Sequence, residues 1–320
     1  MSTFSVLLPF MPMRSEQIVP YAALVQASTA YRLWQGQSML AETHQSFAYA
    51  AAMGLRVPVG TGVTLMPFRH PLEAALQARS LAAVTSNPVV AGLGPGGASV
   101  QTMVYGKPYK SPITACREYV TIVRGLLAGD DMACSGEYFS FYGSGLAALP
   151  GPPVEIGLGV LRPGMARLAG EIADVAITWL TPPGYLRDCV LPALREGAAA
   201  AGRTAPRVVA IVPVALSKPS RDPVKLVLAS NQGHLHGPHY QDMLRRAGIT
   251  IDTGDLAAGA RALLDENVFV SGDMENLVKG FDAYREAGVD EIVLNVTGVF
   301  HTEGGPAALS ELAAIITQVA

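Results

Sequence analysis

The chain has 320 residues, of which 50% are hydrophobic and 15% are charged, and its formal net charge is −3. This composition excludes a disordered chain, because disordered chains carry few apolar residues and strong charge repulsion. The 23 lysines and arginines are scattered along the chain, which argues against a nucleic-acid partner. We therefore expect a globular protein that acts on a small-molecule or peptide substrate.

The longest stretch without a charged residue covers residues 80–106, which is long enough to span a bilayer. Asn87-Pro88 and the run from Gly94 to Gly97 interrupt it, and backbone groups freed by such breaks cannot stay unsatisfied in lipid. The N-terminus lacks the basic opening and the cleavage site of a signal peptide. The three cysteines are widely spaced, as in a reducing compartment. The sequence thus predicts no membrane partner and a cytoplasmic location.

Short β-rich segments alternate with longer segments of helical period, a pattern typical of parallel sheets built from βαβ units. Strands are expected at residues 4–8, 31–34, 57–61, 89–93, 154–157, 175–178, 208–216 and 292–296. Helices are expected at residues 16–28, 43–53, 71–84, 113–127, 164–172, 185–201, 273–287 and 306–319. Eight strands alternating with eight helices predict an α/β fold of the (β/α)8 TIM-barrel class, with residues 1–320 as a single domain.

Two segments exceed what a minimal barrel needs. Residues 134–153 are rich in glycine and proline and predict a hairpin and loop between the fourth and fifth strands. Residues 217–267 are too long for a simple connection and predict an insertion with short helices. We expect the inserted segments at the C-terminal face of the barrel, where the second could cover the mouth.

Glycine-rich loops follow the third and fourth strands, at the end of the barrel where active sites are expected. The third strand ends in Gly60-Thr61-Gly62-Val63, and the fourth ends in Gly94-Pro95-Gly96. The glycines after the third strand allow close backbone approach or an unusual peptide conformation. The loop after the fourth strand would let a flat ring or a phosphate lie against the backbone, with a plain tight turn as the alternative.

The fifth strand leads into Gly159-Val160-Leu161-Arg162-Pro163-Gly164, in which the proline marks a helix start. Free N–H groups and the positive end of the helix dipole favour an anion there, and Arg162 could add a charged contact. A surface arginine beside an ordinary loop is the alternative. The glycines do not keep the spacing of a dinucleotide fingerprint, which sets a Rossmann site aside.

Aromatic and titratable side chains supply the remaining candidates. Trp34 and Trp179 fall at predicted strand ends, where each could stack on a planar ligand or pack in the barrel core. His44 is a candidate acid or base, with a structural role as the alternative. His234 and His236 belong to a histidine triplet in the second insert, which we interpret as substrate contact, mobile lid or solvated loop. No metal site is expected, because catalytic zinc needs three ligands on rigid elements.

Together these segments resemble the luciferase-like flavin- or deazaflavin-dependent oxidoreductases, which are (β/α)8 barrels. The resemblance covers most of the chain and rests on the order and spacing of several motifs. They are Val59-Gly-Thr-Gly-Val63, Arg69-His-Pro71, Val90-Ala-Gly-Leu-Gly-Pro-Gly96, Gly136-Glu-Tyr-Phe139, Ala173-Asp174, Ala201-Gly-Arg203, Val270-Ser-Gly-Asp273 and Ala287-Gly-Val-Asp-Glu291.

The resemblance implies an isoalloxazine or deazaflavin ring at the barrel mouth, on the loops after the third and fourth strands. It also implies a cis peptide near Gly62-Val63 and a cofactor phosphate in the loop 159–164. We count Trp34 and Gln37 among the expected cofactor contacts. Gly97 departs from the pattern, because several deazaflavin-dependent relatives have an acidic residue at that place. The proton donor therefore stays open between His44, a tyrosine, water and the substrate.

From this resemblance we expect a reductase in which reduced coenzyme F420 delivers a hydride to an electron-poor double bond or carbonyl. The specific substrate hypothesis is a dehydroamino acid in a peptide natural product. The rival is an FMN-dependent two-component monooxygenase, and a non-catalytic cofactor-binding barrel is the alternative from another class. A homodimer is expected, because burying apolar helix faces suits a chain with so little surface charge.

Overall fold

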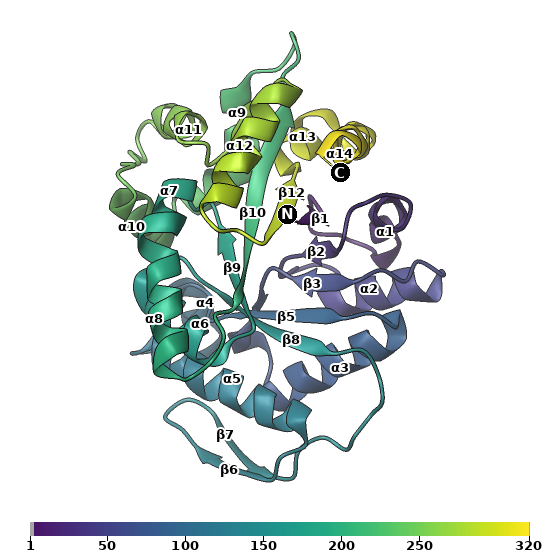
Figure 1. Ribbon diagram of the computed structural model, residues 1–320, viewed down its shortest axis with the longest axis vertical. Coiled ribbons are helices and arrows are strands. Elements are labelled where there is room, and N and C mark those ends of the chain that lie inside the picture. The colour runs from purple at the N-terminus through teal and green to yellow at the C-terminus, as the bar shows by residue number, and fades with distance from the viewer. Residues whose placement is uncertain (1–2, 320) are drawn as a thin grey trace.

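The computed structural model describes residues 3–319, and within them eight parallel strands form a closed barrel (Figure 1). Each strand pairs with its neighbours in the ring, and β12 pairs with β1 to close it. The barrel strands are β1 (Thr3–Leu7), β2 (Leu33–Gln35), β3 (Val59–Thr61), β5 (Val89–Gly94), β8 (Val154–Gly159), β9 (Val175–Trp179), β10 (Arg207–Leu216) and β12 (Glu291–Asn295). The predicted TIM barrel is confirmed, and each predicted strand overlaps one of these.

Four further strands lie outside the ring. They are β4 (Thr64–Leu65), which pairs with β5, β11 (Val270–Gly272), which pairs with the end of β10, and the hairpin of β6 (Met132–Ser135) and β7 (Ser140–Gly143). Because β4 and β11 extend the sheet at the carboxyl ends of β5 and β10, they help to build the rim of the barrel mouth.

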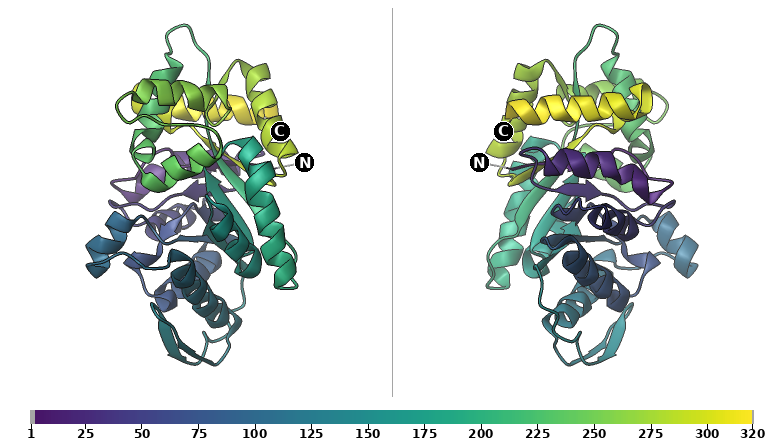
Figure 2. Two further views of the ribbon diagram at one scale, coloured as in Figure 1. Left: turned by 90° about the vertical axis from the view of Figure 1, so that its left-hand side faces the viewer. Right: turned by 90° about the vertical axis from the view of Figure 1, so that its right-hand side faces the viewer.

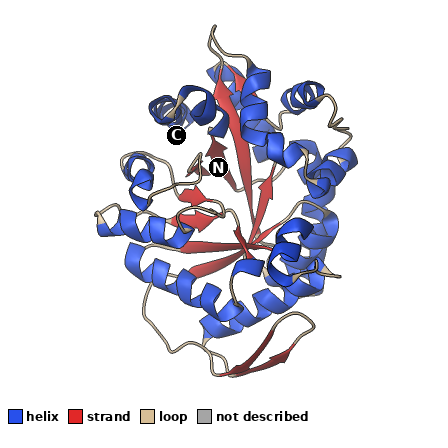
Figure 3. Cartoon of the chain, turned by 180° about the vertical axis from the view of Figure 1, so that it is seen from behind, coloured by secondary structure: helices blue, strands red, loops and turns tan. Residues whose placement is uncertain are grey.

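Helices surround the barrel on its outside (Figure 3). The described chain contains the helices α1 (Val19–Gln26), α2 (Thr43–Ala52), α3 (Pro71–Thr85), α4 (Ala98–Tyr105), α5 (Pro112–Ala128), α6 (Pro163–Ile172), α7 (Pro183–Tyr185), α8 (Leu191–Ala200), α9 (Pro223–Leu235), α10 (Pro238–Arg246), α11 (Leu256–Asp265), α12 (Met274–Glu286), α13 (Thr297–Glu303) and α14 (Gly305–Val319), with the helical turns η1 (Ser15–Ile18), η2 (Met66–Phe68) and η3 (Leu186–Val190). The first helix, α1, and the last, α14, lie side by side (Figure 2). Within residues 3–319, no helix combines the length and the apolar character needed to cross a membrane.

Side-chain caps fix where four of the eight predicted helices begin. Glu42 accepts a hydrogen bond from the Gln45 N–H at the start of α2, and Asp273 accepts one from Asn276 at the start of α12. The helix predicted at residues 273–287 therefore begins at a side-chain cap. The short helices α4 and α13 were not predicted, since both begin directly after a strand without a capping side chain of their own.

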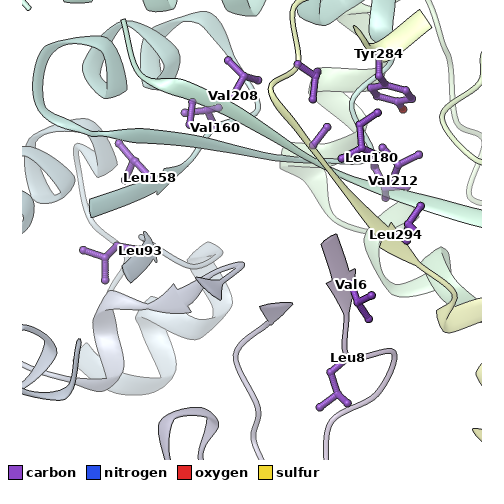
Figure 4. Packing of buried hydrophobic residues seen from close by; sticks show 14 of the residues in the cluster. Val6, Leu8, Leu93, Leu158, Val160, Leu180, Val208, Val212, Tyr284 and Leu294 are labelled. Atoms are coloured by element: carbon purple, nitrogen blue, oxygen red, sulfur yellow. The ribbon is translucent and has the colours of Figure 1, made fainter. Parts of the chain in front are cut away.

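Side chains alternate along the strands between two cores. In β5, Val89 packs toward the surrounding helices, whereas the next residue, Val90, points into the barrel. Figure 4 shows part of the outer core, to which Val6, Leu158 and Val212 contribute from three different strands. The inner core consists of Leu7, Trp34, Val90, Val175, Ile177, Val209, Ile211 and Val293.

A buried charged cluster lies beneath this inner core, around the first residue of β12. Glu291 is 0% exposed and accepts hydrogen bonds from Ser5 Oγ at 2.6 Å and from Trp34 Nε1 at 2.7 Å. Arg32, also 0% exposed, lies 3.9 Å from the same carboxylate, and Arg207 lies 3.5 Å from it. Opposite charges and N–H donors thus compensate the burial of Glu291, as a carboxylate in an apolar interior requires.

The first insert packs along helix α5, on the side away from the barrel strands (Figures 1 and 3). The Glu118 carboxylate of α5 accepts hydrogen bonds from the N–H groups of residues 137–139 at the turn of the hairpin. The predicted hairpin is confirmed, although it begins at Met132 rather than at residue 134. Its expected place at the C-terminal face is corrected, because Glu118 holds the turn against the outer surface of α5.

The second insert, residues 217–267, contains α9, α10 and α11, as the expected short helices. An ion-pair cluster anchors it to the end of the chain. Arg221, whose side chain is 4% exposed, pairs with Glu311 of α14 at 2.7 Å and with Glu303 of α13 at 2.5 Å. The insert is therefore held firmly where it leaves β10, at the C-terminal end of the barrel.

Candidate active site

A cavity of about 1200 Å³ lies at the C-terminal ends of the barrel strands. Its wall comes from the glycine loops after β3, β5 and β8, from the end of β1 with α13, and from the corner between α9 and α10. This volume is larger than that of most small-molecule pockets, which measure about 300–1,000 Å³, and leaves room for a cofactor together with a substrate. The second insert thus forms one wall of the cavity.

The floor of the cavity is glycine backbone around one valine. The peptide bond between Gly62 and Val63 is cis, as the resemblance implied. A Cβ added at Gly94 would lie 2.7 Å from Val63 Cγ2, and one at Gly159 would lie 3.4 Å from Val63 Cγ1. Glycine at these positions keeps the ends of β3, β5 and β8 close together and leaves their backbone bare toward the cavity.

Three of the predicted cofactor contacts lie below this floor rather than on it. A Cβ at Gly60 would lie 2.7 Å from the Trp34 indole ring, so Gly60 makes room for Trp34 in the inner core. Thr61 Oγ1 donates to the Gly92 carbonyl at 2.9 Å and accepts from the Gly92 N–H at 2.8 Å. The structure therefore corrects the expectation that Trp34, Gly60 and Thr61 contact the cofactor directly. Trp34 is a core residue, as the alternative interpretation had it, and its indole N–H donates to Glu291.

Helix N-termini without a side-chain cap face the cavity. The N-cap residues of α4, α6 and α10 are Gly97, Arg162 and Gly237; all three line the cavity, and none makes a capping hydrogen bond with its side chain. By contrast, side chains cap α2, α3, α9, α11 and α12, whose first residues do not line the cavity, and also α5, whose first residue, Pro112, does. Uncapped N–H groups and the positive end of the helix dipole favour an anion at this end of the cavity.

Arg162, the expected phosphate-binding cation, is already paired. Its Nη1 donates to Asp242 Oδ2 of α10 at 3.1 Å, and Asp242 also bonds Arg245 and Arg246. The hydrogen bonds from Arg246 and then from Arg162 lower the pKa of Asp242 to about 2, so this carboxylate is charged at neutral pH. Arg162 therefore ties the loop after β8 to the second insert, and its expected contact with a cofactor phosphate stays a prediction.

Few charges line the cavity. Among the described residues of its wall, Arg162 is the single Arg or Lys, and neither Asp nor Glu occurs. Histidines occur instead, with His234, His236 and His239 from the second insert and His301 from α13. Any proton that the wall itself supplies must come from an imidazole or a hydroxyl group.

One wall is an aromatic cluster that joins β9 to the second insert. The Trp179 and His234 rings are stacked, with centroids 5.2 Å apart and an interplanar angle of 26°. Tyr240 stands edge-on to His234 at 5.0 Å and touches His239 at 4.6 Å. Burial, with a smaller contribution from His239, lowers the pKa of His234 to about 4, and burial and Arg162 lower that of His239. Both imidazoles are neutral at pH 7.

His44 does not reach this cavity. It lies in the first turn of α2, where its Nδ1 is 2.8 Å from Glu42 Oε1, and Arg69 lies 3.4 Å from the same oxygen. Burial alone would raise the pKa of Glu42, but the bonds to His44 and to the Gln45 N–H, together with Arg69, lower it. The structure thus places His44 in a polar cluster at a helix start, which is the structural alternative to a catalytic role.

The predicted site residues divide into two groups. Those on the cavity wall are Gln37, Gly62, Val63, Gly94, Pro95, Gly96, Gly159, Leu161, Arg162, Trp179, His234 and His236. Those that the structure does not bring to the wall are Trp34, His44, Gly60, Thr61, Pro163 and Gly164.

Sequence reasoning missed several wall residues that side-chain packing brings in. Gln101 of α4 is 3% exposed, and its amide donates to the carbonyls of Pro95 and Gly96 at 3.1 and 2.8 Å. The Gln101 carbonyl accepts the Tyr109 N–H at 2.9 Å, which places Tyr109 on the wall. A glutamine inside the long charge-free stretch was the one signal that could have identified this support of the glycine loop.

The wall also carries buried polar atoms without protein partners. Gln35 Oε1, Tyr109 Oη, Trp179 Nε1 and His234 Nδ1 make no hydrogen bond to the described residues. These atoms have almost no accessible surface, so they do not face the open cavity. Bare backbone on the floor and uncapped helix N-termini together fit a planar ring that carries an anionic tail.

Such a cavity at the mouth of a (β/α)8 barrel defines a cofactor-dependent barrel enzyme. Within that class the chain belongs to the luciferase-like monooxygenase family, whose sequence model matches residues 6–291. The resemblance found in the sequence is thereby confirmed, and the protein is an enzyme.

Individual relatives carry two different cofactors. Over 266 residues the chain is 28% identical to the F420-dependent glucose-6-phosphate dehydrogenase of Nocardia farcinica. This alignment covers 79% of this chain and 78% of the relative. An F420-dependent secondary alcohol dehydrogenase, solved with an F420–acetone adduct, superposes with a TM-score of 0.75 at 18% identity over 100% of this chain and 99% of that chain. The oxygenating constituent of 3,6-diketocamphane monooxygenase from Pseudomonas putida, solved with FMN, superposes with a TM-score of 0.74 at 16% identity over 100% and 98%. At these identities the two structures show a shared fold, and both expected cofactors, F420 and FMN, occur among the relatives.

Proposed function

We propose that this enzyme uses reduced coenzyme F420 to transfer a hydride to an electron-poor double bond or carbonyl of an organic substrate. The observation that carries the proposal is the large cavity with a bare glycine floor and uncapped helix N-termini, in a chain with an F420-dependent sequence relative. When bound, the coenzyme supplies the hydride, and the protein supplies orientation and a shielded site.

Distinct parts of the cavity wall serve the ring and the tail of the coenzyme in this proposal. Residues 62–63 and 94–96 would support the flat ring, because their backbone is bare toward the cavity. The first turns of α4 and α6 would hold the phosphate and the anionic tail through free N–H groups. Leu161 and Arg162 at the start of α6 would flank the phosphate.

The charge of the wall bears on the substrate. Arg162 is the single Arg or Lys among the described wall residues, and Asp242 neutralises it. No cation is left for a phosphorylated substrate once an anionic coenzyme tail is bound. We therefore propose a neutral acceptor, and specifically a dehydroamino acid in a peptide natural product, whose conjugated double bond is electron-poor.

A histidine near the floor is the proton donor that we favour. A Cβ at Gly97 would lie 3.7 Å from His239 Cε1, so the bare Gly97 leaves room for His239 beside the loop 94–97. His239 is neutral at pH 7, because burial and then Arg162 lower its pKa. As its N–H proton passes to the substrate carbanion, the other ring nitrogen would take a proton from water, so the imidazole would remain neutral and the proton would come from solvent.

Turnover tests this proposal. Purified protein, reduced F420 and a capped dehydroalanine peptide should give oxidised F420 and the saturated alanine peptide in equal amounts. Oxygen-dependent product formation with reduced FMN alone would support the monooxygenase rival. Binding of F420 without oxidation by any electron-poor alkene or carbonyl would support the non-catalytic barrel.

We also propose that the protein forms a homodimer. Tyr49 of α2, Met53 at the C-cap of α2 and Val84 of α3 are exposed at 38%, 59% and 40%, and α2 packs against α3. An exposed apolar face of this kind is covered at low cost by a second copy. Light scattering after size-exclusion chromatography should give twice the mass of the chain, whereas a concentration-independent monomer would contradict the proposal.

A further inference from the structure

One buried side chain, that of Gln101, holds the glycine loop after β5. Its Nε2 donates to the carbonyls of Pro95 and Gly96 at 3.1 and 2.8 Å, and its Oε1 accepts the Tyr109 N–H at 2.9 Å. The side chain is 3% exposed, so these bonds are shielded from water. A single amide thus joins the loop to the connection between α4 and α5.

The two carbonyls fix the direction of two backbone N–H groups. Both belong to trans peptides, because the one cis bond in the described chain lies between Gly62 and Val63. In a trans peptide the C=O and the N–H point in opposite directions. The N–H groups of Gly96 and Gly97 therefore point away from the Gln101 amide, and neither has an acceptor among the described residues. Gly96 and Gly97 are partly exposed and line the cavity, so a ligand can reach them.

The peptide between Gly96 and Gly97 is free to flip unless a contact fixes it, because glycine stands on both sides. Gly96 has a φ of +69°, and Gly97 has a φ of −74°. A flip would turn the φ of Gly97 by about 180°, to positive values that glycine adopts readily and other residues avoid. The flipped loop would present a carbonyl oxygen in place of an N–H. The bond from Gln101 to the Gly96 carbonyl opposes this flip.

We infer that Gln101 is a positioning residue, which fixes the peptides on either side of Gly96 so that their N–H groups face the anionic part of the coenzyme. The inference deepens the proposed function, on which it rests for the ligand. An N–H donates to an anion, whereas a carbonyl oxygen in the same place would repel it. Gln101 acts through the loop rather than by a contact of its own.

Equilibrium titration with two ligands tests this inference. One is F420, and the other is 8-hydroxy-5-deazariboflavin, which has the same ring and ribityl chain but no phosphate or acidic tail. Gln101→Met keeps the length of the side chain and removes its donor and acceptor. This variant should bind F420 about tenfold more weakly, as expected for a hydrogen bond to a charged group, and the phosphate-free ligand within about twofold of the wild type. Equal loss for both ligands would overturn the inference.

A double-mutant cycle with Gly97→Ala locates the effect at the peptide. Alanine accepts a φ near −74° but not the positive φ of a flipped peptide, so it holds the native orientation without Gln101. The added Cβ would meet no atom closer than His239 Cε1 at 3.7 Å, an ordinary contact. When Gly97→Ala is already present, Gln101→Met should weaken F420 binding by less than about threefold. A tenfold loss in both backgrounds would overturn the inference.

Two further variants separate positioning from a loss of folding. Gln77→Met is the matched control, because Gln77 of α3 does not line the cavity, and it should leave both affinities unchanged. Gln101→Asn is a second, milder variant. Its shorter side chain cannot span the loop and the Tyr109 N–H, and it should show the same selective loss of F420 binding. Circular dichroism verifies the fold of each variant.

The outcome is separable from that of the proposed function. If the wild type oxidises reduced F420 but Gln101→Met loses no selectivity between the two ligands, the positioning role is wrong and the reductase stands. If the selective loss is observed but no acceptor oxidises reduced F420, the positioning role stands and the proposed reaction is wrong.

Discussion

Adding a single methyl group to the cavity floor should close the cofactor seat. In Gly94→Ala the new Cβ would lie 2.7 Å from Val63 Cγ2, whereas carbon atoms in good contact are about 3.5–4.0 Å apart. Relief of this contact requires Val63 to move, and Val63 is itself part of the cavity floor. Overpacking of this kind costs about 1–3 kcal/mol. If the floor shifts to relieve it, F420 affinity should fall by about tenfold.

Two further variants make this prediction specific. In Gly94→Ala with Val63→Ala the closest remaining atom is Val63 Cβ at 3.7 Å, an ordinary contact, so the double variant should recover stability and much of the affinity. Gly184→Ala is the matched control, since its Cβ would meet nothing within 4 Å and Gly184 does not line the cavity. Thermal unfolding and F420 titration measure both quantities. Unchanged affinity and melting temperature in Gly94→Ala, or no recovery in the double variant, would refute the reasoning.

Three other perturbations probe the core, the aromatic wall and His44, which lies outside the cavity. Glu291→Gln removes the buried charge that pairs with Arg32 and should lower the free energy of unfolding in urea by about 3 kcal/mol; an unchanged midpoint would show that the cluster is not stabilising. The pKa of His234 falls from its ordinary 6.5 to about 4 on folding, so the unfolded chain binds more protons between these values. Stability should therefore be complete above pH 6.5 and decline toward pH 4, and His234→Phe should flatten this part of the melting-temperature profile; parallel profiles would contradict the burial of a neutral imidazole. His44→Asn should change kcat for reduced F420 oxidation by less than about threefold, because His44 lies outside the cavity, and a hundredfold loss would restore it as a catalytic residue.

Local patterns along the chain were sufficient to predict the barrel. In β5 and β12, for example, consecutive apolar residues serve the inner and outer cores in turn, which produces the continuous β-branched runs seen in the sequence. Capping residues such as Asp273 marked helix starts that the structure retains. The helices α4 and α13 escaped prediction because their starts depend on the preceding strand ends and not on caps of their own.

The candidate site was predictable where it consists of backbone. Gly62, Gly94 and Gly159 are visible in a sequence as glycines at strand ends, and all three line the cavity. Side-chain placement was not predictable in the same way. Trp34 precedes Gln35 by one residue, yet Trp34 is in the inner core with its N–H on Glu291, and Gln35 lines the cavity.

Long-range pairing accounts for the other misplaced residues. Arg162 looked like a free cation because its partner, Asp242, is distant in the sequence and arrives only when the second insert folds over the barrel. His239 was not singled out for the same reason, since its position beside Gly97 depends on α10. Contacts between an insert and the strand ends follow from tertiary packing, which local sequence patterns do not record.

The most direct test is a calorimetric titration of the purified protein with F420 and, separately, with FMN. We predict saturable binding of one F420 per chain, tighter than that of FMN and weakened by Gly94→Ala. Tight binding of FMN without F420 binding, or binding of neither cofactor, would contradict the assignment of this cavity to a deazaflavin coenzyme.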